Sequence, residues 1–192
     1  MGIDTLVFQS IHGFVGWSGV LDAAGVFFAR YLPYILGIAL VVFVFRGHSS
    51  KARVRTFLFL ALMALLSRGI LAESIRFFFP RVRPFDALGF TPLIPGYGSS
   101  FPSGHAAFFF TMSFAVFAIN RKWGWWFFVL SALNGLARVF VGVHYPLDIV
   151  GGFLVALVSY LVCMPLFKTT IHHADEEYSE TQEESSSRRE TV

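Results

Sequence analysis

The feature that most constrains the fold of this chain is a series of five apolar stretches, each 17 to 26 residues long. A helix that crosses a bilayer needs about 20 mostly apolar residues, because the hydrocarbon core is ~30 Å thick. The stretches are residues 20–45, 54–79, 103–119, 123–143 and 146–167. Since 55% of the 192 residues are hydrophobic and only 14% are charged, one water-soluble core would not hide them. We therefore predict an all-α fold, a polytopic membrane helical bundle of five transmembrane helices, or six if the N-terminal region also spans.

The two ends of the chain lie outside these stretches. Residues 3–15 are too short to span and lack a basic start, so we expect an interfacial helix rather than a signal peptide. The last 21 residues carry seven acids, two bases and few apolar side chains, which predicts disorder. We expect an integral-membrane domain over residues 1–171 and a disordered acidic cytoplasmic tail over residues 172–192, to which we assign no function.

Basic residues in the short loops predict the orientation of the bundle. They fall between the first and second stretches, between the third and fourth, and after the fifth: Arg46, Lys51, Arg53, Arg55, Arg121, Lys122 and Lys168. Five spans place all three groups on one side, which we predict to be cytoplasmic. The opposite, outer face receives the long segment 80–102, where Arg81 and Arg83 break the pattern.

Three clusters of polar residues fall at this outer end of the helices. The first runs from Arg76 to Arg83-Pro84, the second is Pro102-Ser103-Gly104-His105, and the third joins Arg138, His144 and Asp148. Charged groups at membrane depth are costly and normally face a polar cavity that holds a partner. The clusters therefore predict one site at the outer end of the bundle.

The residue types in this site indicate phosphate binding. Guanidinium groups match the geometry of phosphate oxygens, and Arg76, Arg83 and Arg138 exceed what the few outer-face acids would neutralise. Ser103-Gly104 begins a helix, whose free N–H groups attract an anion, and glycine lets a phosphate approach the backbone. Such a site needs no metal or other cofactor, and the lone Cys163 excludes a multi-cysteine metal site.

Two histidines complete a possible reaction. Asp148 follows His144 by four residues, so its carboxylate is expected to fix one ring nitrogen and leave the other as a nucleophile. His105, next to the phosphate-binding residues, is expected to act as a general acid toward the departing oxygen. The pattern predicts attack of His144 on phosphorus, a phosphohistidine intermediate and its hydrolysis by water.

In order and spacing, the three clusters resemble the signature motifs of the type-2 phosphatidic acid phosphatase superfamily, K-x6-R-P, P-S-G-H and S-R-x5-H-x3-D. The resemblance implies a membrane helical bundle with a phosphatase/haloperoxidase-like core and a metal-independent site. It implies His144 as nucleophile, Asp148 as its orienting carboxylate and His105 as acid. The implied phosphate-binding residues are Arg76, Arg83, Ser103, Gly104 and Arg138. Two positions depart from the motifs, Arg76 in place of lysine and Ala137 in place of serine.

Weaker features resemble the bacterial undecaprenyl diphosphate phosphatases, a branch of this superfamily that regenerates a C55 carrier lipid for cell-wall synthesis. They are Ile11-His12-Gly13, Leu21-Asp22 and Arg83-Pro84-Phe85. The implied partners are a lipid phosphate or diphosphate and membrane lipids, with no nucleic acid, and the oligomeric state is left open. Phosphatidylglycerophosphate or phosphatidic acid phosphatase is the alternative within this chemistry. An anion-binding transporter and an inactive lipid-binding homologue are alternatives from other classes.

Several residues have a plainer interpretation. We expect Arg81 to meet lipid headgroups, with substrate contact as the alternative. Arg68 and Glu73 should pair within the bundle, although Glu73 at the substrate entrance is an alternative. We expect His12 to lie on the surface together with His48, His172 and His173. The Phe77–Phe79 and Phe108–Phe110 runs should face lipid and neighbouring helices, and Trp123, Trp125 and Trp126 should anchor the cytoplasmic interface.

Overall fold

The computed structural model describes residues 2–46 and 50–167, apart from the side chain of Ala52. Within these residues the secondary structure is helical and no strand occurs. The predicted tail, its boundary after residue 171, and the histidines His48, His172 and His173 lie outside the described residues. The chain divides into two compact units, Met1–Tyr160 and Leu161–Val192, and the site described below lies within the first.

The first two long helices each contain one widened, π-helical turn. The first combines α2 (Gly19–Val26), η1 (Phe27–Tyr31) and α3 (Leu32–Phe45), and the second combines α4 (Ser50–Ala64), η2 (Leu65–Leu71) and α5 (Ala72–Phe78). Such turns insert an extra residue into an α-helix and often occur at functional sites. The apolar pattern predicted both helices but not these turns.

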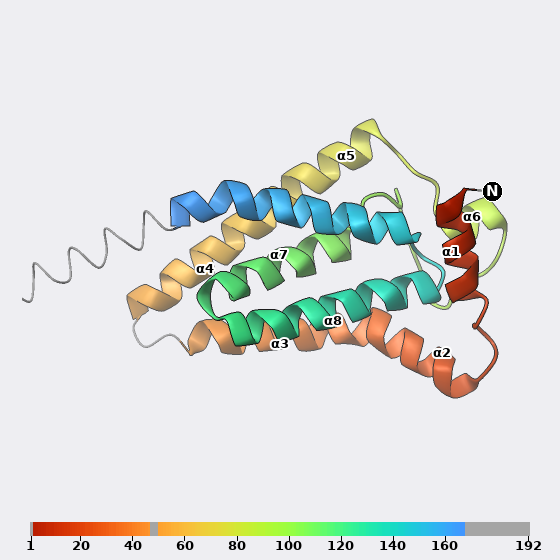
Figure 1. Cartoon of the computed structure of the whole chain (residues 1–192), viewed down its shortest axis with the longest axis horizontal. Helices are drawn as coiled ribbons and strands as arrows, with labels where there is room; N and C mark the ends of the chain where they lie inside the picture. The colour runs from red at the N-terminus through yellow and green to blue at the C-terminus, as the bar shows by residue number, and fades with distance from the viewer. Residues whose placement is uncertain (1, 47–49, 168–192) are drawn as a thin grey trace, which may run out of the picture. The chain divides into compact units, whose positions relative to one another are not determined.

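The remaining long helices are α7 (Gly104–Ile119), α8 (Arg121–Phe140) and the C-terminal helix Pro146–Phe167. Asn120 ends α7 and caps α8, because its side-chain oxygen accepts from the N–H of Trp123 at 3.1 Å. Two short helices, α1 (Ile3–His12) and α6 (Pro84–Leu88), lie at the opposite end of the α7–α8 pair from this turn (Figure 1).

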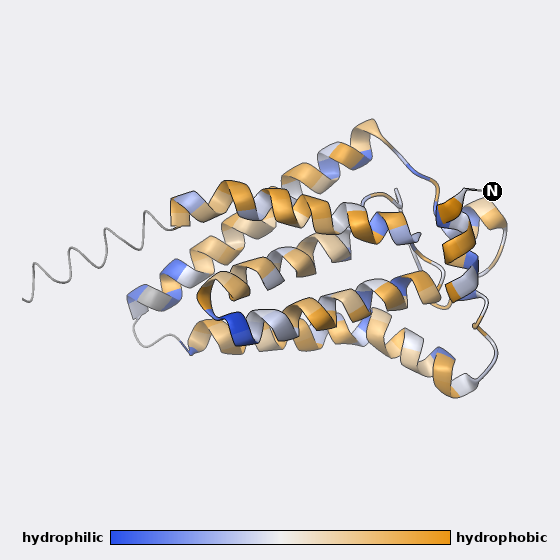
Figure 2. Ribbon diagram, viewed as in Figure 1, coloured by the Kyte–Doolittle hydropathy of each residue, from blue (hydrophilic) through white to orange (hydrophobic). Residues whose placement is uncertain are grey.

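Three helical segments are long and apolar enough to cross a membrane: Gly19–Phe45, Arg53–Phe78 and Pro146–Phe167. Their outward side chains are apolar and exposed, and hydrophilic residues gather near the helix ends (Figure 2). α7 is apolar but has only 16 residues, and α8 buries the polar side chains of Asn134 and Arg138. The prediction of an all-α membrane bundle is confirmed, whereas the total of five or six spans stays a prediction, because three of the described helices qualify by length and composition.

The core of the bundle is centred on α7, which packs most extensively against α8. Ser113 and Ser131 are buried between these helices and their hydroxyls are 3.0 Å apart. The C-terminal helix approaches α7 closely at Gly152, where an added Cβ would lie 2.6 Å from the Cβ of Ala106. Small residues and interhelical hydrogen bonds of this kind hold helices together in a membrane. Burial of apolar side chains contributes little there, because lipid tails are as apolar as the neighbouring helix.

The predicted cytoplasmic loops meet at one end of the bundle. The guanidinium of Arg46, after α3, lies 5.2 Å from the ring centroid of Trp123 at the start of α8. Arg121, also at this end, lies over the ring of Phe117 at 5.7 Å. Arg46 and Arg121 therefore share one end and the three polar clusters occupy the other, whereas Lys168 lies outside the described residues.

Candidate active site

The centre of the site is a buried histidine–carboxylate pair. His144 lies in the connection between α8 and the C-terminal helix, where Gly142 adopts a left-handed conformation with φ of 90°. Its Nδ1 lies 3.4 Å from Oδ2 of Asp148, which is ion-pair range, although this atom makes no well-aligned hydrogen bond. The side chains are 1% and 0% exposed, so the predicted four-residue pairing forms inside the protein.

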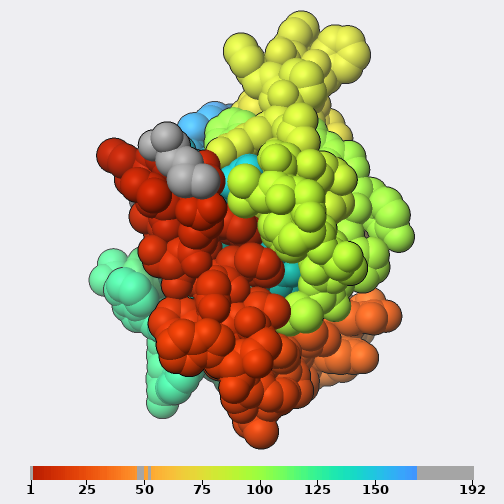
Figure 3. All heavy atoms as spheres, turned by 90° about the vertical axis from the view of Figure 1, so that its right-hand side faces the viewer, coloured from red at the N-terminus to blue at the C-terminus, as the bar shows by residue number. Residues whose placement is uncertain are grey.

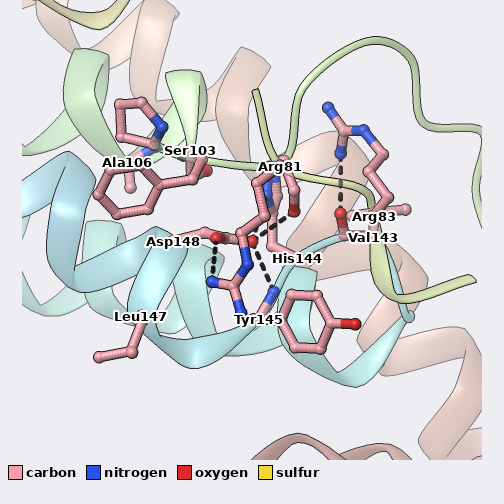
Figure 4. Close-up of polar contacts among 12 residues, drawn as sticks. Arg81, Arg83, Ser103, Ala106, Val143, His144, Tyr145, Leu147 and Asp148 are labelled. Carbon is pink, nitrogen blue, oxygen red and sulfur yellow. Dashed lines mark hydrogen bonds and ion pairs between the residues drawn. The ribbon is translucent and has the colours of Figure 1, made fainter. Parts of the chain in front are cut away.

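Asp148 is held from several sides (Figure 4). Its Oδ2 accepts from the hydroxyl of Ser100 and, at 2.7 Å, from the N–H of Tyr145. Its Oδ1 accepts from Nη1 of Arg81 at 2.8 Å. The backbone carbonyl of Asp148 also accepts from the N–H of Ser103 at 2.9 Å, which joins the third cluster to the second.

Burial and positive charge keep the His144 ring neutral. Burial is the largest cause that lowers the pKa of His144, and the guanidiniums of Arg138 and Arg83 lower it further, whereas Asp148 raises it. The net effect lowers the pKa from its usual 6.5 to about 4. A neutral imidazole has a free lone pair, which a nucleophile requires.

Arg138 projects from the last turn of α8 with spare hydrogen-bonding capacity. The guanidinium is buried, and its Nη1 donates to the carbonyl of Ala29 at 3.3 Å. That carbonyl lies in η1, whose wide turn also leaves the carbonyl of Phe28 to accept from Asn134 at 2.7 Å. The Nε of Arg138 is buried without a hydrogen-bond partner. A buried donor without a hydrogen-bond partner is costly, so the Nε–H of Arg138 is suited to donate to an anionic ligand.

Arg83 is also buried, but unlike Arg138 it uses most of its N–H donors within the protein. Its guanidinium donates to the carbonyls of Tyr97, Gly98, Ser99 and Val143 at 2.7 to 3.3 Å. Arginine has five N–H donors, so one N–H of Nη1 remains for a ligand. Arg83 therefore ties the 97–99 segment to the residue before His144 while it contributes positive charge to the site.

Arg76, Arg68 and Glu73 form a charged group beside the start of α7. Nε and Nη2 of Arg76 both donate to the carbonyl of Pro102, at 3.2 and 3.0 Å, and Nη1 donates to Glu73. A lysine has no such fork, so the arginine gains a two-point contact at this position of the motif. Glu73 also pairs with Arg68, which confirms the pairing expected within the bundle.

The N-terminus of α7 supplies backbone donors. Ser103 caps the helix, because its hydroxyl accepts from the N–H of Ala106 at 3.4 Å. No described residue accepts a hydrogen bond from the N–H of Gly104 or His105. An added Cβ at Gly104 would lie 2.6 Å from Nε of Arg68 and 2.8 Å from Nη2 of Arg76. Glycine thus lets two guanidiniums lie directly against the helix end, where they and the free N–H groups favour an anion.

His105 follows on the first turn of α7. Its side chain is exposed, and its ring contacts that of Phe109 at a centroid distance of 6.3 Å. The charged groups close enough to His105 to interact with it are Arg138, His144, Arg68 and Arg76. The predicted site residues therefore come together from α5, α7, α8 and the start of the C-terminal helix. A cleft of about 700 Å³ opens beside them, and Glu73, Arg76, Phe77, Phe78, Tyr97 and Ser99 lie on its wall.

Two predictions from the sequence are wrong. Arg81 is not a headgroup-facing residue, because its guanidinium bonds Asp148 and, at 2.6 Å, Oδ2 of Asp4. His12 is half-buried rather than on the surface. Its Nδ1 lies 2.7 Å from the carbonyl oxygen of Phe140, and its ring stacks on Phe8. Both residues attach the N-terminal helix to the site.

Asp4 and Ser100 are site residues that the sequence motifs did not indicate. Asp4 reaches the site from α1, and Ser100 from the segment before α7. Figure 3 shows the N-terminal segment and the 80–100 region together covering this end of the first unit. The only signal for either residue was an indirect one, the unexplained positive charge of Arg81 on the outer face.

Comparisons with known proteins agree with this geometry. The PAP2 superfamily matches residues 57–171, which is more than half of the chain. Undecaprenyl-diphosphatase BcrC of Bacillus subtilis (strain 168) is 33% identical over 155 residues, 79% of this chain and 78% of that protein. Bacitracin transport permease protein BcrC of Bacillus licheniformis is 32% identical over 144 residues, 74% and 70% of the two chains.

A solved structure shares the fold. The crystal structure of Aquifex aeolicus LpxE superposes with a TM-score of 0.68 at 28% identity, covering 86% of this chain and 96% of that chain. The family match includes all three polar clusters, in agreement with the resemblance drawn from their spacing. The chain belongs to the PAP2 superfamily.

Proposed function

We propose that this membrane phosphatase removes the terminal phosphate of undecaprenyl diphosphate by way of a phosphohistidine at His144. The observation that supports it most is the buried His144–Asp148 pair beside the unpaired Nε of Arg138 and the free N–H groups of α7. The substrate is suggested by the printed name of the Bacillus subtilis relative, which is similar over most of both chains.

The proposed reaction begins with attack of the neutral Nε2 of His144 on the terminal phosphorus. The bond from phosphorus to the bridging oxygen breaks, and His105 donates a proton toward the departing lipid phosphate. Arg76, Arg138, the remaining N–H of Arg83 and the Ser103–Gly104 helix start stabilise charge on the equatorial oxygens. Water then attacks the phosphohistidine, the P–N bond breaks, and orthophosphate leaves.

The charge distribution supports an outward-facing site. The opposite end of the bundle carries Arg46, Lys51, Arg53, Arg55, Arg121 and Lys122, and no acidic residue lies among the described residues there. At the site end, Arg81 pairs with Asp4 and Asp148, and Arg76 pairs with Glu73. Lysine and arginine in short loops are enriched on the cytoplasmic side of membrane proteins, so the positive-inside rule favours a cytoplasmic position for the end that carries these six bases.

The name of the Bacillus licheniformis relative directs attention to the transporter alternative. A transporter would need anion-binding residues along a path through the bilayer. Here Arg76, Arg83 and Arg138 converge at one end around a histidine–carboxylate pair, an arrangement that serves bond cleavage rather than passage. The hydrolase is therefore the better-supported function.

Phosphate release from undecaprenyl diphosphate by purified protein in detergent tests the proposal. We expect the wild type to be active with EDTA present, and His144→Ala to lose at least about 10³-fold in kcat, as expected for removal of a nucleophile. Activity retained in His144→Ala would exclude the assigned nucleophile. A panel with phosphatidylglycerophosphate and phosphatidic acid distinguishes the substrate, since the proposal requires the highest kcat/KM for the diphosphate.

Thiol labelling tests the orientation. In a Cys163→Ser background, an impermeant thiol reagent should label Ala87→Cys, in α6, from outside intact cells. Lys122→Cys, at the other end, should react only after permeabilisation. The reverse pattern would contradict an outward-facing site.

A further inference from the structure

The Arg81 side chain bridges two carboxylates that are 144 positions apart in the sequence. Its Nη1 donates to Oδ1 of Asp148 at 2.8 Å, and its Nη2 donates to Oδ2 of Asp4 at 2.6 Å. The guanidinium also stacks over the ring of Tyr145, 4.1 Å from the centroid (Figure 4). Both terminal nitrogens and one face of the guanidinium are thus engaged by the protein rather than directed at a ligand.

Asp4 makes a second contact with the same region. Its Oδ1 accepts from the N–H of Leu147 at 2.9 Å, in the first turn of the helix that carries Asp148. The side chain of Asp4 is only 10% exposed. Beside it, Phe8 of α1 is buried against Val139 and Tyr145. One carboxylate on α1 therefore caps the helix of Asp148 and anchors the arginine that bonds Asp148.

The contacts of Asp148 show what this bridge achieves. Ser100 and the N–H of Tyr145 bond Oδ2, the oxygen that lies 3.4 Å from His144. Arg81 is the one hydrogen-bond donor to Oδ1 among the described residues. Without Arg81, Oδ1 would lose its donor, and the carboxylate would be held toward the histidine only by the two bonds to Oδ2, which allows it a wider range of orientations.

We infer that Asp4 and Arg81 are positioning residues for Asp148, which makes the N-terminal helix part of the catalytic apparatus. This inference rests on the proposed function, since it assigns Asp148 the role of orienting the nucleophile. The alternative is that the two ion pairs merely attach α1 to the bundle. The positioning role and the purely structural role differ in what they predict for the pKa of His144.

The charges around Asp148 determine this difference. Asp148 faces His144, Arg81 from the segment between α5 and α6, and through Arg81 the carboxylate of Asp4 on α1, while His144 also interacts with Arg138 of α8. Arg76 and Arg83 interact with Asp148 at longer range. Removal of the Arg81 charge leaves Asp148 less compensated, which raises the pKa of His144. Removal of the Asp4 charge acts in the opposite direction, because Arg81 then compensates Asp148 more fully.

The test compares Arg81→Met, Arg81→Lys and Asp4→Asn by their kcat, KM and pH profile on undecaprenyl diphosphate. Misplacement of a catalytic group costs up to about 10²-fold, so we expect Arg81→Met to lower kcat about 10- to 100-fold. The KM should stay within about twofold, because Arg81 does not contact the substrate. The low-pH limb of kcat/KM should move to higher pH in Arg81→Met, but not in Asp4→Asn. Arg81→Lys, which retains the charge, should recover part of kcat and the wild-type limb.

Matched controls separate this effect from a general loss of charge. Arg30 also stacks on a tyrosine, Tyr31, and Asp22 also accepts from a backbone N–H, that of Gly16, but neither contacts the site. Arg30→Met and Asp22→Asn should therefore keep wild-type kcat. The double variant Asp4→Asn/Arg81→Met should be no worse than Arg81→Met alone, because an amide oxygen can still accept from the N–H of Leu147 and the charge that Asp4→Asn removes acts through Arg81.

Three outcomes would overturn the inference. One is unchanged kcat in Arg81→Met. Another is a rise of KM alone, which would place Arg81 on the substrate. The third is a loss of kcat with an unshifted pH limb and no recovery in Arg81→Lys, which would leave only a structural anchor. Failure of the proposed function is recognised separately, since it would appear as an inactive wild type or an active His144→Ala.

Discussion

The two sides of the active site use arginine for different purposes. On the side formed by α7 and α8, Arg138 is buried with an unpaired Nε, and the N–H groups that begin α7 have no acceptor among the described residues. On the side formed by α1 and the segment 80–102, Arg81 bonds two carboxylates and Arg83 bonds four carbonyls. Donors that the fold leaves unpaired are available for a ligand, whereas donors that it satisfies hold the site in shape. One residue type is thus left with an unpaired donor on one side and is used for scaffolding on the other.

The largest effect should come from the ligand side. Arg138→Met removes a buried donor directed at developing charge, which costs about 10²- to 10³-fold in kcat at comparable sites. The melting temperature should change little or rise, because Nε has no partner to lose and the carbonyl of Ala29, which loses Nη1, still accepts from Asn134 at 3.4 Å. Initial rates on undecaprenyl diphosphate and thermal unfolding in detergent measure the two quantities. An Arg138→Met variant with the wild-type kcat would contradict the assignment of Arg138 to ligand binding.

A smaller loss is expected at the start of α7. In Gly104→Ala the new methyl group would displace the guanidiniums of Arg68 and Arg76, which lie 2.6 and 2.8 Å from its position. Because these are flexible side-chain ends, the fold should persist while a misplaced donor lowers kcat about 10-fold. The matched control is Gly37→Ala in α3, where an added Cβ meets nothing within 4 Å. Equal kcat values for Gly104→Ala and Gly37→Ala would show that the close approach of the two guanidiniums to Gly104 does not contribute to the reaction.

The scaffold side should respond in stability more than in rate. Arg83→Lys has too few donors for the buried carbonyl of Val143 and the part-buried carbonyls of Tyr97, Gly98 and Ser99, and a buried carbonyl costs about 1–3 kcal/mol when unsatisfied. We expect a lower melting temperature than that of Arg138→Met, with kcat of the folded fraction reduced less than about 10-fold because a positive charge remains. Thermal unfolding of both variants side by side provides the measurement. A more stable Arg83→Lys than Arg138→Met would reverse the assignment of the two sides.

The smallest effect concerns pH. His144 takes up a proton only near its lowered pKa of about 4, so it stays neutral from pH 7 down to 5.5. Corrected for ionisation of the substrate phosphate, kcat/KM should fall by less than about twofold over this range, whereas a histidine with the usual pKa of 6.5 would lose about 10-fold. In Arg138→Met the loss of a nearby positive charge should raise the pKa of His144 and shift the limb upward. A wild-type limb near pH 6.5 would show that burial does not control His144.

Sequence patterns recovered those parts of the site whose partners are close in the chain. The spacing of His144 and Asp148 predicted a pair one helical turn apart, and the Pro102–His105 motif predicted a helix start at Gly104. The same patterns assigned Arg83 to phosphate binding by its motif position but left Arg81 to the lipid headgroups, which is wrong because Arg81 bonds Asp148 and Asp4. The roles of the two arginines depend on Asp4, which is 77 positions from Arg81, and on carbonyls whose direction no local pattern specifies.

Hydropathy and motif spacing were sufficient for the membrane class, the long helices and the superfamily, because bilayer thickness and the 3.6-residue helical turn act on neighbouring residues. The tertiary structure decided which charges are available to a phosphate and which are consumed by the fold. It widened two helices into π-turns, brought α1 onto the site, and left Nε of Arg138 unpaired. These features depend on contacts between distant segments, and whether a buried donor is satisfied is determined only when the segments that surround it have packed.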